Sequence, residues 1–224
     1  MPSATHIFAM AGPALCAALF GGQVLAAELK LRPVDEGARD PSFASFRAAL
    51  LEAVRQRDVE FVVSRASPEI KLSFGGDVGR ETFREGLEGM ADWGGEPYWR
   101  ELERVLELGG VFQGTRYFCT PYISCLDVPG CPDCDPYETM FTLSDHAVAH
   151  AAPDPDSRVV AELSHDVLKI DYDAEFAGDW TPVVLPDGSR GYVSGPDFRM
   201  SIDYRALFEK VDGRWRMTVF IAGD

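Results

Sequence analysis

The sequence predicts an α+β protein in which helices pack on an antiparallel sheet and a small β-barrel forms separately. Three observations predict this class. Apolar residues recur at helical spacing in residues 42–108, short β-branched runs punctuated by Pro, Asp and Gly fill residues 147–200, and a long strand pair closes the chain. With 224 residues, 46% of them hydrophobic, the chain can form one large or two small domains.

Residues 1–27 are typical of a secretory signal peptide. They contain no Asp, Glu, Lys or Arg, they are apolar in the middle, and small residues precede Glu28. We therefore expect cleavage after Ala26 or Ala27. A membrane anchor is the alternative, but glycines interrupt the apolar run and it is short for a stable span. The sequence thus predicts an exported chain, periplasmic or secreted from a bacterium, without stable membrane insertion.

The charge balance excludes one class of partner. The chain carries 36 Asp and Glu residues against 21 Lys and Arg residues, a formal net charge of -15. Because this charge repels phosphate backbones, we expect no nucleic-acid partner. The sequence contains no Gly-rich phosphate loop, no HExxH and no GxSxG motif. We therefore assign no catalytic residue and expect no cofactor.

The part of the mature chain before residue 109 is predicted to be mostly helical. Ser42 is expected to be the N-cap of the first helix. Ile70, Leu72 and Phe74 alternate with polar residues, which predicts a strand between helices. Apolar residues at helical spacing predict helices that start at residues 42, 59, 80 and 96 and end near residues 58, 67, 90 and 108.

The last stretch, residues 201–224, is predicted to be a long hairpin. Apolar residues alternate on both arms, and Asp212-Gly213 stands where a two-residue type I′ turn requires positive φ. Two long strands with one apolar face need a helix or another sheet to cover that face. The amphipathic helices of residues 42–108 are available to cover it, so we expect the hairpin in the sheet of the helical part.

Two stretches resemble known families. Residues 147–200 resemble bacterial SH3-like (SH3b) domains, in which a strand and a Pro are followed by two strands, a tryptophan hairpin and a closing Gly-Tyr-Val. These features are Ala147 to Pro153, Val159 to Ile170, Trp180 to Leu185, and Gly191-Tyr192-Val193. The helices and the much later hairpin with Gly before Trp resemble the cystatin-like (nuclear-transport-factor-2-like) fold, which implies a curved antiparallel sheet around N-terminal helices.

These resemblances imply a division of the chain. A signal peptide would occupy residues 1–27, a discontinuous cystatin-like α+β domain residues 28–140 and 201–224, and an SH3-like β-barrel residues 141–200. The alternative is a tandem order, with a helical domain followed by a β domain that runs to the end of the chain. A small barrel does not need the two strands of the terminal hairpin. This favours the first arrangement, in which the barrel is inserted into the cystatin-like domain.

The cysteines of the mature chain are clustered in FCTPYISCLDVPGCPDC, at Cys119, Cys125, Cys131 and Cys134. In an exported protein such a cluster predicts two disulfides. The pairing is not readable, although a bridge between the last two would close a tight ring and is expected to be strained. A zinc site and a redox CPDC motif are the alternatives, but structural zinc sites usually show two CxxC motifs. We therefore expect no metal.

The SH3-like resemblance implies recognition of a peptide or a cell-wall stem peptide in an aromatic groove. The residues expected to form the groove are Tyr172, Phe176, Trp180 and Tyr192. Alternatively, the last two simply fill the barrel. The adjoining loop holds four carboxylates, which favour a cationic group on the ligand: Asp171, Asp173, Glu175 and Asp179.

We interpret the chain as an exported, non-catalytic binding protein, and two alternatives stay open. Some cystatin-like proteins are isomerases or dehydratases, and a carboxylate among apolar walls has a raised pKa and can shuttle protons. The residues that could line such a pocket are Tyr98, Tyr117, Tyr122 and Asp127. The other alternative is an envelope scaffold whose hairpin dimerises edge to edge. The sequence does not fix the ligand or the oligomeric state.

Overall fold

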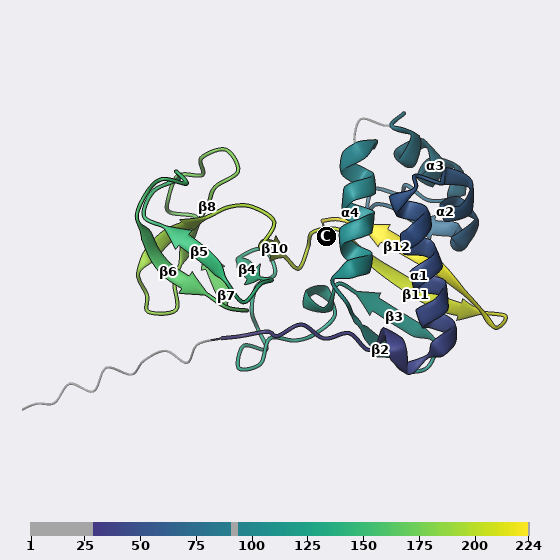
Figure 1. The fold of residues 1–224 in the computed structure, drawn as a ribbon, viewed down its shortest axis with the longest axis horizontal. Helices are drawn as coiled ribbons and strands as arrows, with labels where there is room; N and C mark the ends of the chain where they lie inside the picture. The colour runs from purple at the N-terminus through teal and green to yellow at the C-terminus, as the bar shows by residue number, and fades with distance from the viewer. Residues whose placement is uncertain (1–28, 91–93, 224) are drawn as a thin grey trace, which may run out of the picture.

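The protein is described here by a computed structural model that covers residues 29–90 and 94–223. The predicted signal peptide over residues 1–27 lies outside the described residues. The chain forms two separate sheets, each rich in antiparallel pairs, which are seen as two lobes in Figure 1. The α-helices lie over one face of the first sheet. The α+β class predicted from the sequence is therefore confirmed.

The described residues form four α-helices: α1 (Pro41–Arg55), α2 (Val59–Arg65), α3 (Arg80–Glu88) and α4 (Glu96–Glu107). The N-cap of α1 is Asp40 and not Ser42, because an Asp40 carboxylate oxygen accepts hydrogen bonds from the backbone N–H groups of Ser42 (2.7 Å) and Phe43 (3.2 Å). Pro41 occupies the first helical position, where its fixed φ fits and no N–H is needed. The N-cap therefore lies two residues earlier than predicted.

The first sheet has the order β1-β12-β11-β3-β2. Its strands are β1 (Ala66–Lys71), β2 (Val111–Gln113), β3 (Tyr117–Thr120), β11 (Arg205–Val211) and β12 (Arg214–Ile221). Strand β1 runs parallel to β12, so the sheet is antiparallel except at this edge. Phe74 lies beyond β1 and is exposed, so it does not continue the predicted alternation.

The predicted terminal hairpin is confirmed. Strands β11 and β12 pair antiparallel from Arg205 opposite Ile221 to Val211 opposite Arg214. The turn residues Asp212 and Gly213 have φ values of 49° and 73°, as a type I′ turn requires. Strand β11 also pairs with β3, so the hairpin lies inside the helix-covered sheet.

Aromatic rings fill the core between the helices and the first sheet. The Phe43 ring is fully buried, and its centroid lies 4.1 Å from that of Phe118, 5.5 Å from Phe208 and 4.9 Å from Trp215. The Trp215 indole N–H donates to the Ser42 hydroxyl at 3.0 Å, which ties β12 to the start of α1. Close ring packing of this kind is a large source of stability.

The second sheet, between Thr139 and Met200, has the order β10-β4-β7-β8-β9-β5-β6. Its strands are β4 (Thr139–Thr142), β5 (Ala147–His150), β6 (Val159–Leu163), β7 (Val167–Ile170), β8 (Thr181–Val184), β9 (Arg190–Val193) and β10 (Phe198–Met200). Strands β10 and β6 stand at opposite ends of this order, and no closed barrel forms within the part of the chain that the structure describes. The predicted closed barrel is therefore wrong, because β4 and β10 extend the sheet at one edge instead of closing it.

Several contacts join the two sheets. The guanidinium of Arg199 on β10 donates to the Glu101 carboxylate of α4 at 2.8 Å and to the Tyr204 carbonyl at 2.7 Å. The N-terminal segment crosses between the lobes, as Figure 1 shows. Its Leu31 N–H donates to the His165 carbonyl at 3.0 Å, and its Glu36 N–H donates to the Gly110 carbonyl at 2.8 Å.

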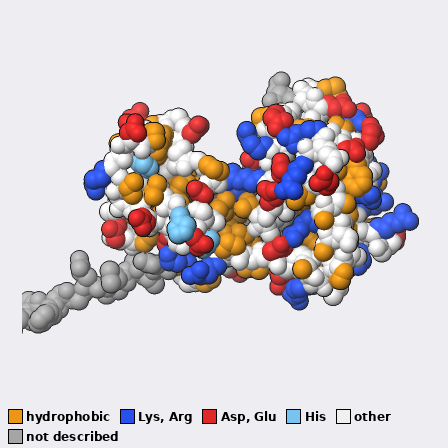
Figure 2. Space-filling model, in the orientation of Figure 1, with side chains coloured by type: hydrophobic (Ala, Val, Ile, Leu, Met, Phe, Trp, Pro, Cys, Tyr) orange, Lys and Arg blue, Asp and Glu red, His pale blue; other side chains and the backbone are white. Residues whose placement is uncertain are grey.

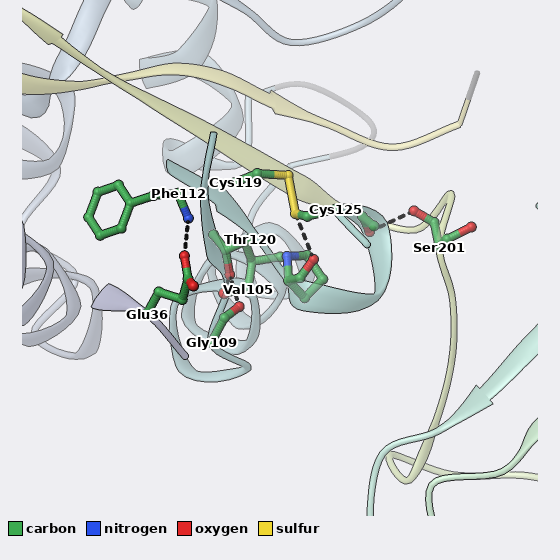
Figure 3. Close-up of a disulfide and its surroundings, with 10 residues drawn as sticks. Glu36, Val105, Gly109, Phe112, Cys119, Thr120, Cys125 and Ser201 are labelled. Carbon is green, nitrogen blue, oxygen red and sulfur yellow. Dashed lines mark hydrogen bonds between the residues drawn. A yellow bond between two sulfur atoms is a disulfide. The ribbon is translucent and has the colours of Figure 1, made fainter. Parts of the chain in front are cut away.

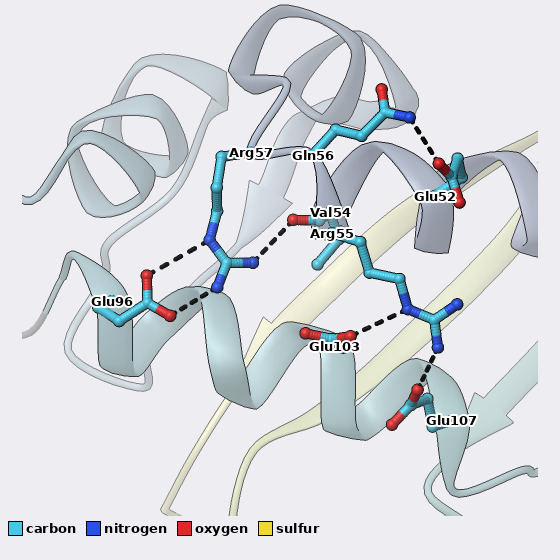
Figure 4. A network of polar contacts seen from close by, with 8 residues as sticks. All are labelled: Glu52, Val54, Arg55, Gln56, Arg57, Glu96, Glu103 and Glu107. Carbon is cyan, nitrogen blue, oxygen red and sulfur yellow. Dashed lines mark hydrogen bonds and ion pairs between the residues drawn. The ribbon is translucent and has the colours of Figure 1, made fainter.

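Ion pairs also link the helices to one another (Figure 4). Arg55, in the last turn of α1, contacts Glu103 and Glu107 of α4, and Arg57 contacts Glu96 at the start of α4. These side chains are largely exposed, so each pair contributes only about 0–1 kcal/mol. Helix packing therefore depends on the apolar core.

In residues 29–90 and 94–223, no helix has the length and apolar character to span a bilayer.

Candidate functional site

The candidate site lies on the face of the second sheet that does not contact its core. Register pairs place Lys169 of β7 opposite Val184 of β8, and Val184 opposite Arg190 of β9. Directly opposed residues share a face, and alternate residues of a strand point to opposite faces. The neighbouring Ile170 and Val183 are buried in the core of this sheet. The register therefore presents both cationic side chains on the outer face.

A groove of about 320 Å³ follows this outer face. It is lined by Glu138, Lys169, Ile170, Asp171, Tyr172, Asp173, Val184 and Arg190. The Lys169 ammonium lies 2.9 Å from the Glu138 carboxylate, and the Arg190 guanidinium lies 3.1 Å from the Asp171 carboxylate. The two ion pairs leave Asp173 as the remaining charged residue among those that line the groove. The volume of the groove is within the range of small-ligand sites.

Tyr172, which lines this groove, forms an exposed pair of aromatic rings with Phe176. Tyr172 and Phe176 have exposed fractions of 57% and 47%, and their ring centroids are 5.6 Å apart. The Tyr172 hydroxyl donates to the Tyr137 carbonyl at 2.6 Å, so this ring is held in place although it is open to solvent. Tyr137 is itself 45% exposed. Tyr137, which lies two residues before β4 and belongs to no motif, was not expected from the sequence.

The other two expected groove residues lie nearer β5 and β9. The Trp180 ring contacts the His150 ring, with centroids 5.3 Å apart. Tyr192 lies opposite His150 in the β5–β9 pairing and opposite Pro182 in the β8–β9 pairing. Trp180 and Tyr192 are partly exposed, and neither belongs to the buried core of this sheet. The four expected aromatic residues thus lie at two places along the outer face.

The surroundings of the aromatic pair are acidic. Asp173, Glu175 and Asp179 form no ion pair within the described part of the chain. The hydrogen bond and charge of Glu138 raise the pKa of Lys169 above its ordinary value. Acidic side chains are spread over both lobes on the face that Figure 2 shows. A ligand at this site meets a negative potential, which favours a cationic group.

The four clustered cysteines form two disulfides, Cys119–Cys125 and Cys131–Cys134. Cys119 lies in β3, and Figure 3 shows its bridge beside Thr120, whose hydroxyl hydrogen bonds to the carbonyl oxygens of Val105 and Gly109, each at 2.6 Å. This bridge therefore sits where β3 meets the end of α4. Both disulfides are compatible with an oxidising compartment.

The Cys131–Cys134 bridge closes the tight ring that the sequence predicted for this pairing. The two Cα atoms lie 5.4 Å apart, within the usual range for a disulfide, because the backbone turns tightly and the Cys134 N–H donates to the Cys131 carbonyl. Since all four cysteines are bridged, they do not offer the thiolates that a zinc site needs. In the described ranges, no group of three or more His, Cys, Asp or Glu residues is placed to hold a metal ion.

The structure does not assemble the residues of the isomerase-like alternative. Tyr98 is buried in the core of the first sheet, whereas Tyr122 is buried in a separate cluster with Leu31. Burial raises the pKa of Tyr122 to about 12. Tyr117 and Asp127 are exposed. No common pocket mouth is formed by these four side chains.

Fold and site together define a class: a two-sheet α+β protein with two disulfides and an aromatic, acidic groove on its all-β part. No protein-family model and no curated protein matches the chain. A structural neighbour is described as a calcium/calmodulin dependent protein kinase II association domain from Xanthomonas campestris. It is 12% identical, the match covers 88% of this chain and 96% of the neighbour, and the TM-score is 0.26. A TM-score of this size does not establish a shared fold.

Proposed function

We propose that this chain is an exported, non-catalytic binding protein whose second sheet recognises a peptide-like ligand with a cationic group. The ligand class we favour is a cell-wall stem peptide with a free amine. The observation that carries the proposal is the exposed Tyr172–Phe176 ring pair beside the acidic groove. Rigid aromatic side chains supply large contact areas at low entropic cost, which makes them common anchors for peptides.

Two further features support the proposal. The hydroxyl of Tyr172 is fixed by the Tyr137 carbonyl, so little side-chain freedom is lost when a ligand covers the ring. The carboxylates of Asp173 and Glu175 lie in the same loop as the two rings, where they can attract an ammonium group. The combination of ring faces and carboxylates suits a cation better than an anion.

The proposal includes the compartment and the division of the chain. The two disulfides and the apolar segment before Glu28 support export to the bacterial periplasm or beyond. Strands β5 to β9 fall within the segments that resemble SH3b domains, which supports an opened SH3-like unit over residues 141–200. The pairing of β11 with β3 supports a cystatin-like unit made of residues 28–140 and 201–224.

Binding measurements on residues 28–224, purified from an oxidising compartment, test the proposal. We expect the protein to sediment with peptidoglycan and to bind soluble stem peptides in a calorimetric titration. Affinity should fall as salt is raised, because exposed charges are screened. The proposal fails if the protein neither sediments with peptidoglycan nor binds the peptides.

The variant Phe176→Ala should weaken stem-peptide binding about tenfold, in line with the loss of an aromatic anchor. The matched control is Phe74→Ala, because Phe74 has a nearly equal exposed fraction (48% against 47%) but follows β1 in the other lobe. Equal losses in both variants would show that the effect is not local to the groove.

A further inference from the structure

A second groove, of about 410 Å³, adjoins the groove lined by Tyr172, which we call the aromatic groove. It is lined by Leu29, Cys131, Asp133, Cys134, Asp135, Glu138, Thr139, Val167, Leu168, Lys169, Val184, Leu185 and Pro186. Glu138, Lys169 and Val184 line both grooves. We call this second one the aliphatic groove.

The walls of the aliphatic groove come from four separate parts of the chain. The N-terminal segment contributes Leu29, whose carbonyl accepts a hydrogen bond from the Val167 N–H of β7 at 2.8 Å. Strand β8 and the turn after it contribute Val184, Leu185 and Pro186, and the Cys131–Cys134 disulfide completes the lining. These walls are aliphatic or sulfur-containing. A ligand is therefore held by burial of its apolar body.

Negative charges outnumber positive charges along the groove. Three carboxylates line it, those of Asp133, Asp135 and Glu138. The single cation in the lining is Lys169, which pairs with Glu138. Asp133 and Asp135 are exposed and form no ion pair among residues 29–90 and 94–223. One oxygen of Asp135 accepts a hydrogen bond from the Tyr137 N–H at 2.9 Å, which fixes this carboxylate at the rim. An apolar floor under two uncompensated carboxylates is complementary to an amphiphilic cation.

The same carboxylates argue against thiol chemistry at Cys131 and Cys134. A reactive cysteine needs a stabilised thiolate, which neighbouring cations or a helix N-terminus provide. Here Asp133 lies between the two cysteines and Asp135 follows them. Negative neighbours disfavour the thiolate, so the disulfide is a wall of the groove and not its reactive group.

We propose that the aliphatic groove binds an amphiphilic cation: a small molecule with an aliphatic chain and an ammonium group. The chain lies along Val167 and Val184, and the ammonium group meets Asp133 and Asp135. This site is distinct from the aromatic groove, and the inference does not rest on the function proposed above.

Amide chemical shifts of isotope-labelled residues 28–224 test the inference with three ligands. Octylammonium should shift the amides of Val167, Asp135 and Leu185, which line the aliphatic groove and not the aromatic groove, in a saturable way. Octanoate, with the same chain and the opposite charge, should bind at least tenfold more weakly. Ethylammonium should also bind at least tenfold more weakly, because each buried methylene contributes up to about fourfold in affinity. Equal binding of octanoate, or no saturable shift with octylammonium, overturns the inference.

Two variants locate the site. Val167→Thr keeps the shape of the side chain and a strand-forming residue but makes the wall polar, so octylammonium affinity should fall about threefold to tenfold. Asp133→Asn removes one rim charge and should reduce the preference for octylammonium over octanoate. Phe176→Ala should leave octylammonium binding unchanged while it weakens stem-peptide binding. If Phe176→Ala weakens octylammonium binding instead, the cation occupies the aromatic groove and the assignment to the aliphatic groove is wrong.

Discussion

The two lobes use aromatic residues in opposite ways. In the first lobe, rings such as Phe43, Phe118 and Phe208 are fully buried between the helices and the sheet. In the second lobe, Tyr172 and Phe176 are exposed, and the core is built from small and aliphatic residues. That core consists of Met140, Ala147, Ala149, Leu163, Leu168, Ile170, Val183, Leu185 and Val193.

This difference follows from where the rings lie: Phe208 is on a strand face that a helix covers, whereas Tyr172 and Phe176 lie in the exposed loop between β7 and β8. Val183 of β8 points into the core, and its neighbour Val184 faces the grooves. Phe208 of β11 is buried by the same alternation, because its face is covered by helix α1 through Phe43. The second lobe has no described helix over its outer face. Its surface rings are therefore available to a ligand.

The largest expected effect comes from truncating one aromatic ring in each lobe, which tests the difference between them directly. Phe43→Ala should lower the free energy of unfolding by about 3–5 kcal/mol, because it leaves a cavity among packed rings. Phe176→Ala should change that free energy by less than about 0.5 kcal/mol, because the ring is already half exposed. Urea denaturation followed by circular dichroism measures both. A large loss for Phe176→Ala would mean that this ring is structural.

Much of the fold could be predicted from local sequence signals. Helical spacing located the helices, and Asp212-Gly213 located the hairpin, because both signals depend on neighbours in sequence. The open form of the second sheet, where a barrel was expected, could not be predicted in this way. It depends on where β4 and β10 pair, and the pairing of Thr142 with Phe198 joins residues far apart in the chain.

The candidate site was predictable only in part. Tyr172 and Phe176 were expected at a ligand site; the structure places Tyr172 in the lining of the aromatic groove and the Phe176 ring against Tyr172, and their role in binding stays a prediction. Tyr137 was missed because its position depends on a hydrogen bond from Tyr172 across the fold. The aliphatic groove was also missed, since its walls come from segments as distant as Leu29 and Leu185.

The second prediction concerns the buried contact between the lobes. Glu101→Ala leaves the guanidinium of Arg199, which is 2% exposed, without its carboxylate. This should lower the free energy of unfolding by about 3 kcal/mol. The double variant Glu101→Ala and Arg199→Met should recover part of that loss, because no buried charge is then left unpaired. A loss below about 1 kcal/mol in the single variant would show that the lobes are joined mainly by other contacts.

The third prediction compares the two disulfides. Replacing Cys119 and Cys125 by Ser, or Cys131 and Cys134 by Ser, should each cost about 2 kcal/mol of stability, because both bridges close short loops. Only the second replacement should weaken octylammonium binding, because only that bridge lines the aliphatic groove. Thermal unfolding and the shift titration measure the two effects separately. Equal weakening by both replacements would point to a general loss of structure.

The smallest expected effect is at the start of α1 and depends on pH. Hydrogen bonds from Ser42, together with Lys210 at 3.0 Å, lower the pKa of Asp40 from 3.8 to about 2. A carboxyl group whose pKa is lowered by folding stabilises the protein fully above its unfolded pKa, and this contribution is lost as the pH falls through the folded value. Asp40→Ala should therefore cost about 1 kcal/mol at pH 7 and less as the pH falls from about 4 to about 2.

The matched control for this prediction is Asp40→Asn, because Asn also caps helices but does not titrate. It should retain most of the stability at pH 7 and lose the part of the acid dependence that belongs to Asp40. Urea denaturation of the three proteins between pH 2 and pH 7 measures the difference. If Asp40→Asn keeps the full acid dependence of the wild type, the carboxylates responsible lie elsewhere, and the acidic second lobe becomes the region to examine. That outcome would assign acid sensitivity to the lobe with the exposed rings and not to the lobe with the aromatic core.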